Sequence, residues 1–195
     1  MSTAAYSIRR MRRPDADAVR QLWSARFGGD PATQKNWIDA ALASSHSAVG
    51  LVATAALTRD IIGFSLLDVA GPAYVRSYLS LEALDLHPPL ADRNGIFHLS
   101  SVRSDWEGRG VGSGFYERRL AVLADRGVSR IFGIAWHRSQ FFDSRALFEK
   151  YDFTPLATVE RYYDRFEERP HCPDCRADCT CTASLFAREI ENGTF

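Results

Sequence analysis

The 195-residue sequence has no excess of charge of either sign, because 24 lysine and arginine residues balance 24 aspartate and glutamate residues. A balanced chain presents no overall basic field that would attract nucleic acid, and no acidic tail that would imitate it. We therefore expect no nucleic-acid partner.

Long hydrophobic runs are also missing. No stretch of about 18 uncharged apolar residues occurs, so the sequence predicts no membrane-spanning helix and no membrane partner. The longest apolar stretch, residues 48–57, is interrupted by Gly50 and Thr54, which favours a buried strand. Residues 1–13 contain no apolar run long enough for a secretory signal, so we expect a cytoplasmic protein.

Cysteine is absent from the chain until its C-terminal part, where four cysteines lie within ten residues, at Cys172, Cys175, Cys179 and Cys181. In a reducing compartment such clustering favours a metal over disulfides, because thiolates are good ligands for zinc. The spacing C-x2-C-x3-C-x-C can supply a tetrahedron of four thiolates, with His171 as a substitute ligand. We predict a structural zinc ion. A redox switch, an iron–sulfur cluster and four unligated thiols are the alternatives.

Hydrophobic periodicity divides the remaining chain into strands and helices. A helix that contains Val19 and Trp23 is followed by the break at residues 28–31 and by a second helix around Ile38. Residues 70–95 read as mostly irregular, with a short helix or strand at 79–84. Strands are expected at residues 6–11, 48–57, 61–69, 96–102, 130–136, 156–163 and 184–190, and further helices at 115–127 and 143–151.

A glycine-rich turn joins the strand of residues 96–102 to the helix that follows it. Glycine stands at positions 108, 110, 112 and 114. Unpaired backbone N–H groups and the helix dipole allow such a turn to bind phosphate. Both common nucleotide motifs are excluded, since no lysine follows a glycine and no G-x-G-x-x-G spacing occurs. A purely structural turn with positive φ angles is the alternative.

The turn, taken together with Val102 and Glu107, resembles the acetyl-CoA-binding signature of the GNAT superfamily of N-acyltransferases, in which Gln/Arg-x-x-Gly-x-Gly/Ala follows a strand. The order of the elements up to Tyr163 is similar to that family, and Phe-Glu-Lys-Tyr-Asp-Phe at residues 148–153 resembles its Tyr-Glu-Lys-x-Gly-Phe. The resemblance implies a mixed α/β (α+β) fold, with a mostly antiparallel central sheet flanked by helices. It also implies a single N-acetyltransferase domain over residues 1–195, with the cysteine-rich residues 171–181 between the last two strands.

The resemblance implies acetyl-CoA as cosubstrate, with its pyrophosphate held by the backbone amides of the turn. Glu107 departs from the family pattern, which has glutamine or arginine there. Its carboxylate would repel a pyrophosphate unless it turns outward or caps an amide, or unless Arg109 compensates. The residues that we expect to bind the cosubstrate are Ser100, Ser101, Val102, Glu107, Gly108, Arg109, Gly110, Val111, Gly112 and Ser113.

His98 stands four residues before Val102, where much of the family has a glutamate on the cofactor strand. An imidazole with a pKa near 6.5 suits removal of a proton from an amine, directly or through a water. A packed histidine is the alternative. Strict alternation along the strand places His98 and Val102 on one face, and Phe97 and Leu99 on the other. A backbone amide near Ser101 or Val102 would polarise the carbonyl.

Phe148 stands where many family members have a tyrosine that protonates the departing thiolate, and phenylalanine cannot do this. Tyr151, one helical turn later, is the candidate proton donor, with a core aromatic residue as the alternative. A donor is not obligatory, because a thiol with a pKa of about 8.5 is already a fair leaving group.

The activity that the resemblance implies is transfer of an acetyl group from acetyl-CoA to an amine by direct attack, without a cysteine relay. The acceptor is a small-molecule amine or a protein or peptide amine. Asp164, Glu167 and Glu168 are candidates to attract a cationic amine, with a solvated charged turn as the alternative. The sequence leaves the oligomeric state open. Two alternatives from other classes are a non-catalytic acyl-CoA-binding domain and a zinc-stapled protein-interaction module.

Overall fold

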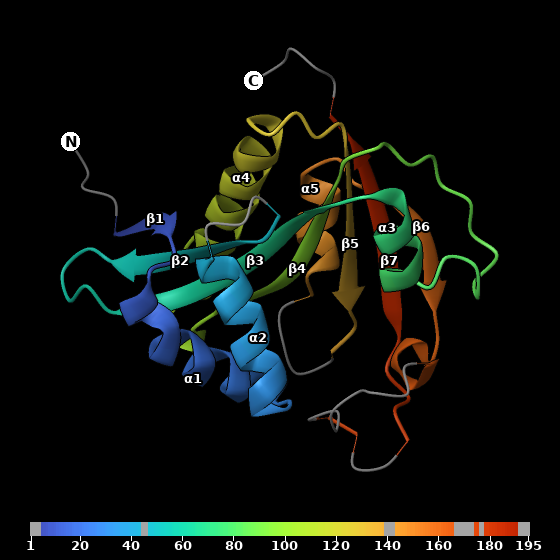
Figure 1. Ribbon diagram of the computed structural model, residues 1–195. Coiled ribbons are helices and arrows are strands. Elements are labelled where there is room, and N and C mark those ends of the chain that lie inside the picture. Colours follow the sequence, from blue (N-terminus) through green and yellow to red (C-terminus); the bar gives the residue numbers. More distant parts are fainter. Residues whose placement is uncertain (1–4, 44–46, 139–142, 166–173, 176–177, 191–195) are drawn as a thin grey trace.

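The computed structural model describes residues 5–43, 47–138, 143–165, 174–175 and 178–190 (Figure 1). Short 3-10 turns cover Arg13–Asp15, Ser104–Trp106 and Tyr162–Arg165. The strands are β1 (Tyr6–Arg10), β2 (Val49–Ala55), β3 (Ile61–Ala70), β4 (Asn94–Val102), β5 (Arg130–Trp136), β6 (Thr154–Val159) and β7 (Ala183–Glu189), and the helices are α1 (Ala16–Phe27), α2 (Pro31–Leu42), α3 (Pro72–Tyr78), α4 (Val111–Ala124) and α5 (Arg145–Lys150).

The strands form one sheet in the order β1-β2-β3-β4-β5-β7-β6. Every neighbouring pair is antiparallel except β4 and β5, which are parallel. A parallel pair needs a crossover, and α4 supplies it. The expectation of a mostly antiparallel mixed sheet flanked by helices is confirmed.

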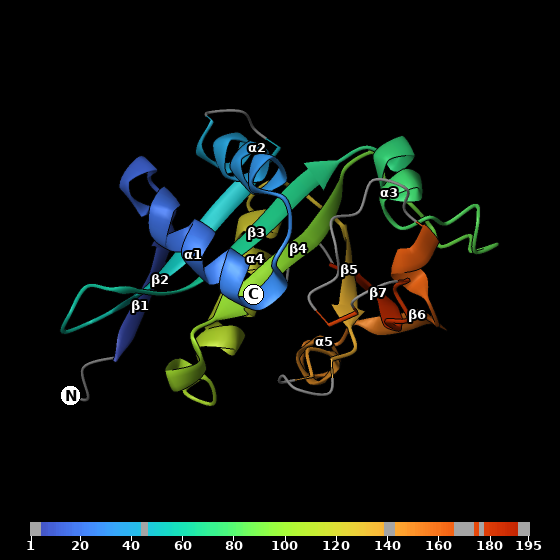
Figure 2. The same ribbon diagram turned by 90° about the horizontal axis from the view of Figure 1, so that it is seen from below.

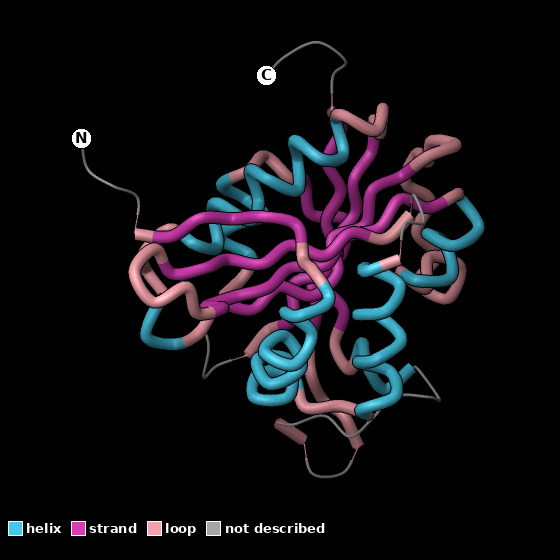
Figure 3. Tube along the Cα trace, turned by 60° about the vertical axis from the view of Figure 1, so that its left-hand side comes forward, coloured by secondary structure: helices cyan, strands magenta, loops and turns pink. Residues whose placement is uncertain are grey.

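The helices cover both faces of the sheet. Leu51 and Ala53 of β2 pack in the same cluster as Phe115 of α4. Val52, between them, packs with Trp23 of α1 and with α2. Because neighbouring strand residues point to opposite faces, α1 and α2 cover one face and α4 covers the other. Figure 3 shows helices on both sides of the strands.

Three element predictions were wrong. The short helix or strand expected at 79–84 is not formed, because these residues make a series of turns. Residues 72–78, expected to be irregular, form α3, because Pro72 suits the first position of a helix and Val75 is buried in a cluster with Leu79. The strand expected at 156–163 ends at Val159. The chain then turns so that Tyr162, fully buried, packs in the same cluster as α3.

None of the helices in the described ranges has both the length and the apolar character that crossing a bilayer requires.

Candidate active site

The two parallel strands at the centre of the sheet separate along part of their length. β4 pairs with β5 only where Asn94–Phe97 lie beside Arg130–Gly133. Beyond that point β4 stays with β3, and β5 stays with β7. Figure 2, which views the molecule from below, shows β4 and β5 as the middle strands, with α1 and α2 beside β3. The separation leaves one edge of β4, from His98 to Val102, without a neighbouring strand among the described residues.

A β-bulge lies at the start of this open edge. Between the pairs Ser65–Ser100 and Leu67–Phe97 there is one residue on β3 and two on β4, His98 and Leu99. Beyond the bulge, the side chains of β4 point to the faces opposite to those that strict alternation predicts. Val102 packs in the same cluster as Phe97, whereas Leu99 packs with the α1 and α2 residues. The predicted faces of the strand were therefore wrong beyond His98.

A cavity of about 970 Å³ occupies the separation. It touches Tyr116, Arg119 and Phe148 on the side of α4 and α5. It also touches Trp37 of α2 and Tyr78 of α3 on the opposite face of the sheet. The lining of a single cavity therefore comes from both faces of the sheet, which suits a reaction between two ligands held on different sides.

The glycine turn forms one end of this cavity. Gly108 and Gly110 have φ angles of +72° and +84°, which a residue with a Cβ rarely adopts. Gly110 is the N-cap of α4 and offers no side-chain cap. In the described hydrogen bonds of the chain, none has an N–H group of residues 108–113 as its donor. Free donors at a helix N-terminus are the arrangement that suits an anion.

The turn is held by β1 and α5. Tyr6 donates a hydrogen bond of 2.9 Å to the Gly110 carbonyl oxygen. A Cβ at Gly114 would lie 2.9 Å from Ile8 Cδ1 and 3.0 Å from the Tyr6 hydroxyl, so only glycine allows β1 this close to α4. Lys150 donates to Ser113 Oγ at 2.9 Å. The donors of the turn are thus fixed in place before any ligand arrives.

The Glu107 carboxylate forms an ion pair with a residue that the sequence analysis did not consider. Arg26, at the end of α1, forms an ion pair with the Glu107 carboxylate and also donates to the Val102 carbonyl oxygen at 3.2 Å. Arg109, the compensating residue expected from the sequence, instead lies over the Trp106 ring at 5.2 Å from its centroid. The partner is 81 positions away in the chain, and no local pattern indicates it.

The open edge of β4 presents backbone groups to the cavity. Arg103 donates its N–H to Ile62 of β3. Successive residues of a strand direct their backbone groups to opposite sides, so Val102 and Ser100 direct theirs away from β3, toward the gap. Ser100 and Val102 line the cavity. Ser101 is buried, with its carbonyl oxygen close to Gly63 of β3, so it does not contribute a backbone group to the gap.

His98 lines the cavity between Trp37 of α2 and Tyr78 of α3. Its ring is 4.3 Å from the Trp37 ring and 4.8 Å from the Tyr78 ring, measured between centroids. Its Nε2 atom is buried without a hydrogen-bond partner among the described residues. Burial, and secondly the charge of Arg119, lower the pKa of His98 to about 3. The imidazole is therefore neutral near pH 7, and the expectation of a pKa near 6.5 was wrong.

The geometry does not support Tyr151 as a proton donor. Its hydroxyl donates to the Ser113 carbonyl oxygen at 3.1 Å and to Glu117 Oε1 at 2.9 Å. Tyr151 is absent from the residues that line the cavity. Phe148 does line it and stacks on Phe186, with centroids 4.7 Å apart. The tyrosine that does line the cavity on this side is Tyr116, which the sequence analysis treated only as an apolar helix position.

Arg119 is a second residue that the sequence analysis missed. Only 2% of it is exposed, and its guanidinium lies over the rings of Phe97 and Tyr116, at 3.7 and 4.4 Å from their centroids. Burial lowers its pKa to about 10. Within the described ranges no carboxylate forms an ion pair with it, and its Nε has no hydrogen-bond partner. In the sequence it is one of two adjacent arginines on a helix, a pattern that does not distinguish burial from exposure.

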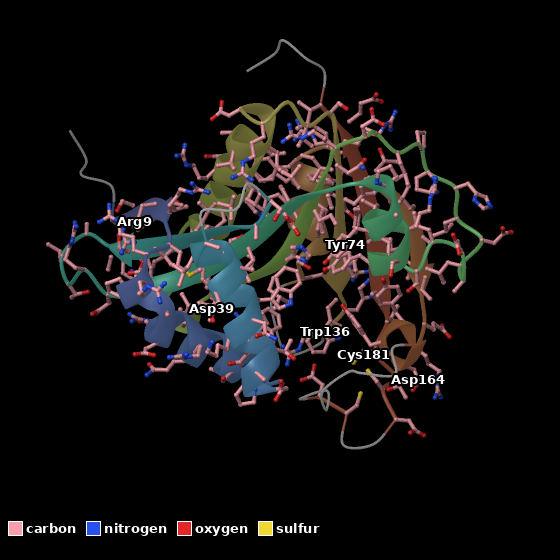
Figure 4. The ribbon with its side chains drawn as sticks, viewed as in Figure 1. Arg9, Asp39, Tyr74, Trp136, Asp164 and Cys181 are labelled. Carbon is pink, nitrogen blue, oxygen red and sulfur yellow. The ribbon has the colours of Figure 1, made fainter. Side chains whose placement is uncertain are left out.

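The other end of the cavity combines aromatic rings with carboxylates. Trp136 lies between Phe27 and Tyr163, at centroid distances of 6.3 and 5.5 Å. Asp164 and Asp178 also line the cavity here. Figure 4 shows Trp136, Asp164 and Cys181 gathered at this end of the molecule. Both groups already have cationic partners within the chain, since the Arg138 guanidinium lies 4.3 Å from the centroid of the Trp136 ring and Arg161 forms an ion pair with Asp164.

Three of the four cysteines meet beside this end. The Sγ atoms of Cys175, Cys179 and Cys181 lie within 4.8 Å of one another, and those of Cys175 and Cys181 are 3.6 Å apart. Two thiolates on one tetrahedral zinc ion, each about 2.3 Å from the metal, are about 3.8 Å apart. The three sulfur atoms fit such a site. Cys172 and His171 lie outside the described residues.

Comparisons with known proteins establish the fold. No family model and no curated protein matches the sequence, whereas many solved structures match the fold. One is an acetyltransferase of the GNAT family from Streptococcus pneumoniae, with 17% identity and a TM-score of 0.62, covering 95% of this chain and 99% of the other. Another is the ribosomal-protein-S18-alanine N-acetyltransferase of Escherichia coli, with 16% identity and a TM-score of 0.62, covering 97% and 99%.

A third similar structure is an agmatine N-acetyltransferase, with 10% identity and a TM-score of 0.67, covering 95% of this chain and all (100%) of the other. At such low identity the agreement concerns the fold and not the activity. The seven-stranded sheet flanked by helices is thus similar in fold to these N-acetyltransferase structures.

Proposed function

We propose that this protein is an N-acetyltransferase that transfers the acetyl group of acetyl-CoA to an amine. The single observation that carries the proposal is the row of free N–H groups at residues 108–113, which opens into a cavity that crosses the sheet. The GNAT fold supports the same function. The alternatives, a non-catalytic acyl-CoA-binding domain and a protein-interaction module, do not account for a cavity that reaches both faces of the sheet.

The cosubstrate is held in two places. The pyrophosphate binds the N–H groups of Gly108 to Ser113, and the Glu107 carboxylate beside them is engaged in an ion pair with Arg26. The thioester arm lies in the separation between β4 and β5, where the backbone groups of Ser100 and Val102 face it. The Val102 amide is suited to polarise the thioester carbonyl.

The amine enters from the opposite face, past Trp37 and Tyr78, and meets His98. An amine N–H donated to Nε2 of neutral His98 leaves the nitrogen lone pair directed at the thioester carbon. The C–N bond forms, the C–S bond breaks, and the proton leaves the nitrogen through His98 or a water beside it. Because the pKa of His98 is about 3, the proton is not retained there. It ends on the thiolate, whose ordinary pKa is about 8.5.

Cys175, Cys179 and Cys181, with Cys172 as the expected fourth ligand, bind a structural zinc ion in this proposal. A closed set of four thiolates leaves no open coordination position, so the ion stabilises the segment before β7 and takes no part in the reaction. Cys179 lines the cavity, so the segment also forms part of the acceptor entrance. The acceptor in this proposal is an amine, either of a small molecule or of a protein or peptide.

The experiment that tests the proposal begins with a titration of the melting temperature with acetyl-CoA, with CoA and adenosine diphosphate as comparators. A ligand at a hundred times its dissociation constant stabilises the folded state by about 2.7 kcal/mol, which shifts the melting temperature clearly. Release of free thiol is then measured with a panel of aromatic, cationic and peptide amines. Binding with transfer supports the enzyme, binding without transfer supports a sensor domain, and failure of acetyl-CoA to bind refutes the proposal.

A further inference from the structure

An arginine without a counter-ion lies at the point where β4 and β5 separate. The Arg119 guanidinium is stacked on the ring of Phe97, the last residue of β4 that pairs with β5. It touches the cavity, and it is almost completely buried. The described part of the chain contains no carboxylate that forms an ion pair with it. A buried charge without a partner is strongly unfavourable, so such an arrangement indicates that an anion is supplied by a ligand.

The position of Arg119 along α4 limits which anionic group of a ligand can reach it. Arg119 follows Gly112 by seven residues on α4, which corresponds to about 10 Å along the helix axis. The pyrophosphate of the cosubstrate, held at the helix N-terminus, is therefore too far away to be its partner. The group that reaches this depth is the acylated end of the thioester arm.

An acetyl group carries no charge, and it would leave the guanidinium unpaired. An acyl group with a terminal carboxylate, such as malonyl, succinyl or glutaryl, brings an anion two to four carbons beyond the sulfur. A planar guanidinium binds a carboxylate through two parallel hydrogen bonds, and the Nε of Arg119 is free to donate one of them. The rings of Phe97 and Tyr116 lie against the guanidinium, and the Tyr116 side chain also forms a hydrogen bond with it, so Nε–H is the group without a partner that is left for the ligand.

We propose that Arg119 is a specificity-determining residue that binds the terminal carboxylate of a dicarboxylic acyl-CoA. This inference rests on the proposed function, since it assumes that an acyl-CoA occupies the cavity. It extends that function, because a dicarboxylic acyl-CoA would be a better donor than acetyl-CoA.

The test is a calorimetric comparison of acyl-CoA pairs of equal chain length, which needs no acceptor. The pairs are malonyl- with propionyl-CoA, succinyl- with butyryl-CoA, and glutaryl- with valeryl-CoA, with CoA itself as reference. In the wild-type protein we expect at least one dicarboxylic member to bind about tenfold to a hundredfold more tightly than its uncharged partner. Arg119→Met should reduce that ratio to within twofold, while its affinity for CoA stays the same.

Arg118→Met is the matched control, because Arg118 is the neighbouring arginine of the same helix and is exposed. It should keep the full preference. Arg119→Met should fold, since it replaces an unpaired buried charge with an apolar side chain of similar length. Arg119→Lys should keep only part of the preference, because an ammonium group cannot make the bidentate contact.

Equal affinities within all three pairs, with CoA bound normally, would overturn the inference and leave the proposed function standing. Failure of CoA itself to bind would overturn both. Loss of affinity for uncharged acyl-CoAs in Arg119→Met, without a dicarboxylic preference in the wild type, would also overturn it. That result would assign Arg119 to the thioester arm or to the leaving thiolate.

Discussion

The two ends of the cavity are built in different ways. The glycine-turn end consists of backbone N–H groups from consecutive residues, held by Tyr6 and Lys150. The acceptor end consists of side chains from α2, α3, β5 and the cysteine segment, which are far apart in the chain. A site made of backbone N–H groups tolerates most amino-acid substitutions, but it depends on the backbone conformation of a few glycines. A side-chain site can change its ligand through single substitutions.

This difference indicates which end of the cavity selects among different ligands. A pyrophosphate is the same in every CoA ester, so a rigid set of backbone donors suffices to bind it. Amines differ in size and charge, and the aromatic and acidic residues around Trp136 and Asp164 can discriminate among them. Arg119 stands between the two ends, where the acyl group would lie. The predictions below test whether the two ends act separately.

Gly110→Glu should produce the largest effect, a loss of at least a hundredfold in acetyl-CoA affinity. The substitution forces a residue with a Cβ into a φ of +84° and places a negative charge beside the expected pyrophosphate. Isothermal titration measures the affinity. Gly127→Glu is the control, because Gly127 has a φ of +66° at the other end of α4 with open space around it. If both variants lose affinity equally, strain and not the anion site explains the result.

His98→Ala should lower the turnover number about a hundredfold with any amine that the wild type acetylates. The affinity for acetyl-CoA should change less than twofold, because His98 is expected to contact the amine and not the cosubstrate. Steady-state kinetics and a separate binding titration check the two parts. An unchanged turnover number would remove His98 from the mechanism.

Loss of the metal should affect the acceptor end alone. We expect denatured wild-type protein to release about one zinc ion per chain, and Cys175→Ser to release much less. In that variant the KM for the amine should rise about tenfold, while the acetyl-CoA affinity stays within twofold. A zinc-release assay and kinetics measure these values. Thr180→Val, which changes the residue beside Cys175 Sγ without removing a thiol, should keep the metal. A stable, fully reduced and metal-free wild type would contradict this expectation.

The smallest effect concerns stability at low pH. The pKa of His98 is lowered from 6.5 to about 3 in the folded protein, by burial and by Arg119. Between these values the unfolded chain binds a proton that the folded chain does not, so stability falls as the pH falls, by at most about 1.4 kcal/mol per pH unit. The melting temperature of His98→Gln, measured from pH 7 to pH 4.5, should therefore fall less steeply than that of the wild type. Parallel curves would show that the ring is protonated in the folded state.

Much of the fold could be predicted because it depends on patterns of residues that are close in the sequence. The strand, glycine turn and helix of β4 and α4 follow one another in the chain, and β2 and β3 are runs of mainly apolar residues that become buried strands. The helix at Pro72–Tyr78 was missed because Gly71 and Pro72 were read as a break, although proline at the first helical turn is favourable. The bulge at His98 and Leu99 was also missed, since nothing in a single strand shows that its neighbour has one residue fewer.

The sequence by itself determined the glycine turn, the cysteine cluster and the order of the elements, because each depends on residues that are neighbours in the chain. Only the tertiary structure decided that Arg26 pairs with Glu107, that His98 stays neutral between Trp37 and Tyr78, and that Arg119 is buried without a counter-ion. These properties depend on burial and on partners from distant segments. The pKa of a side chain and the need for a counter-ion arise only when folding removes water from around the charge.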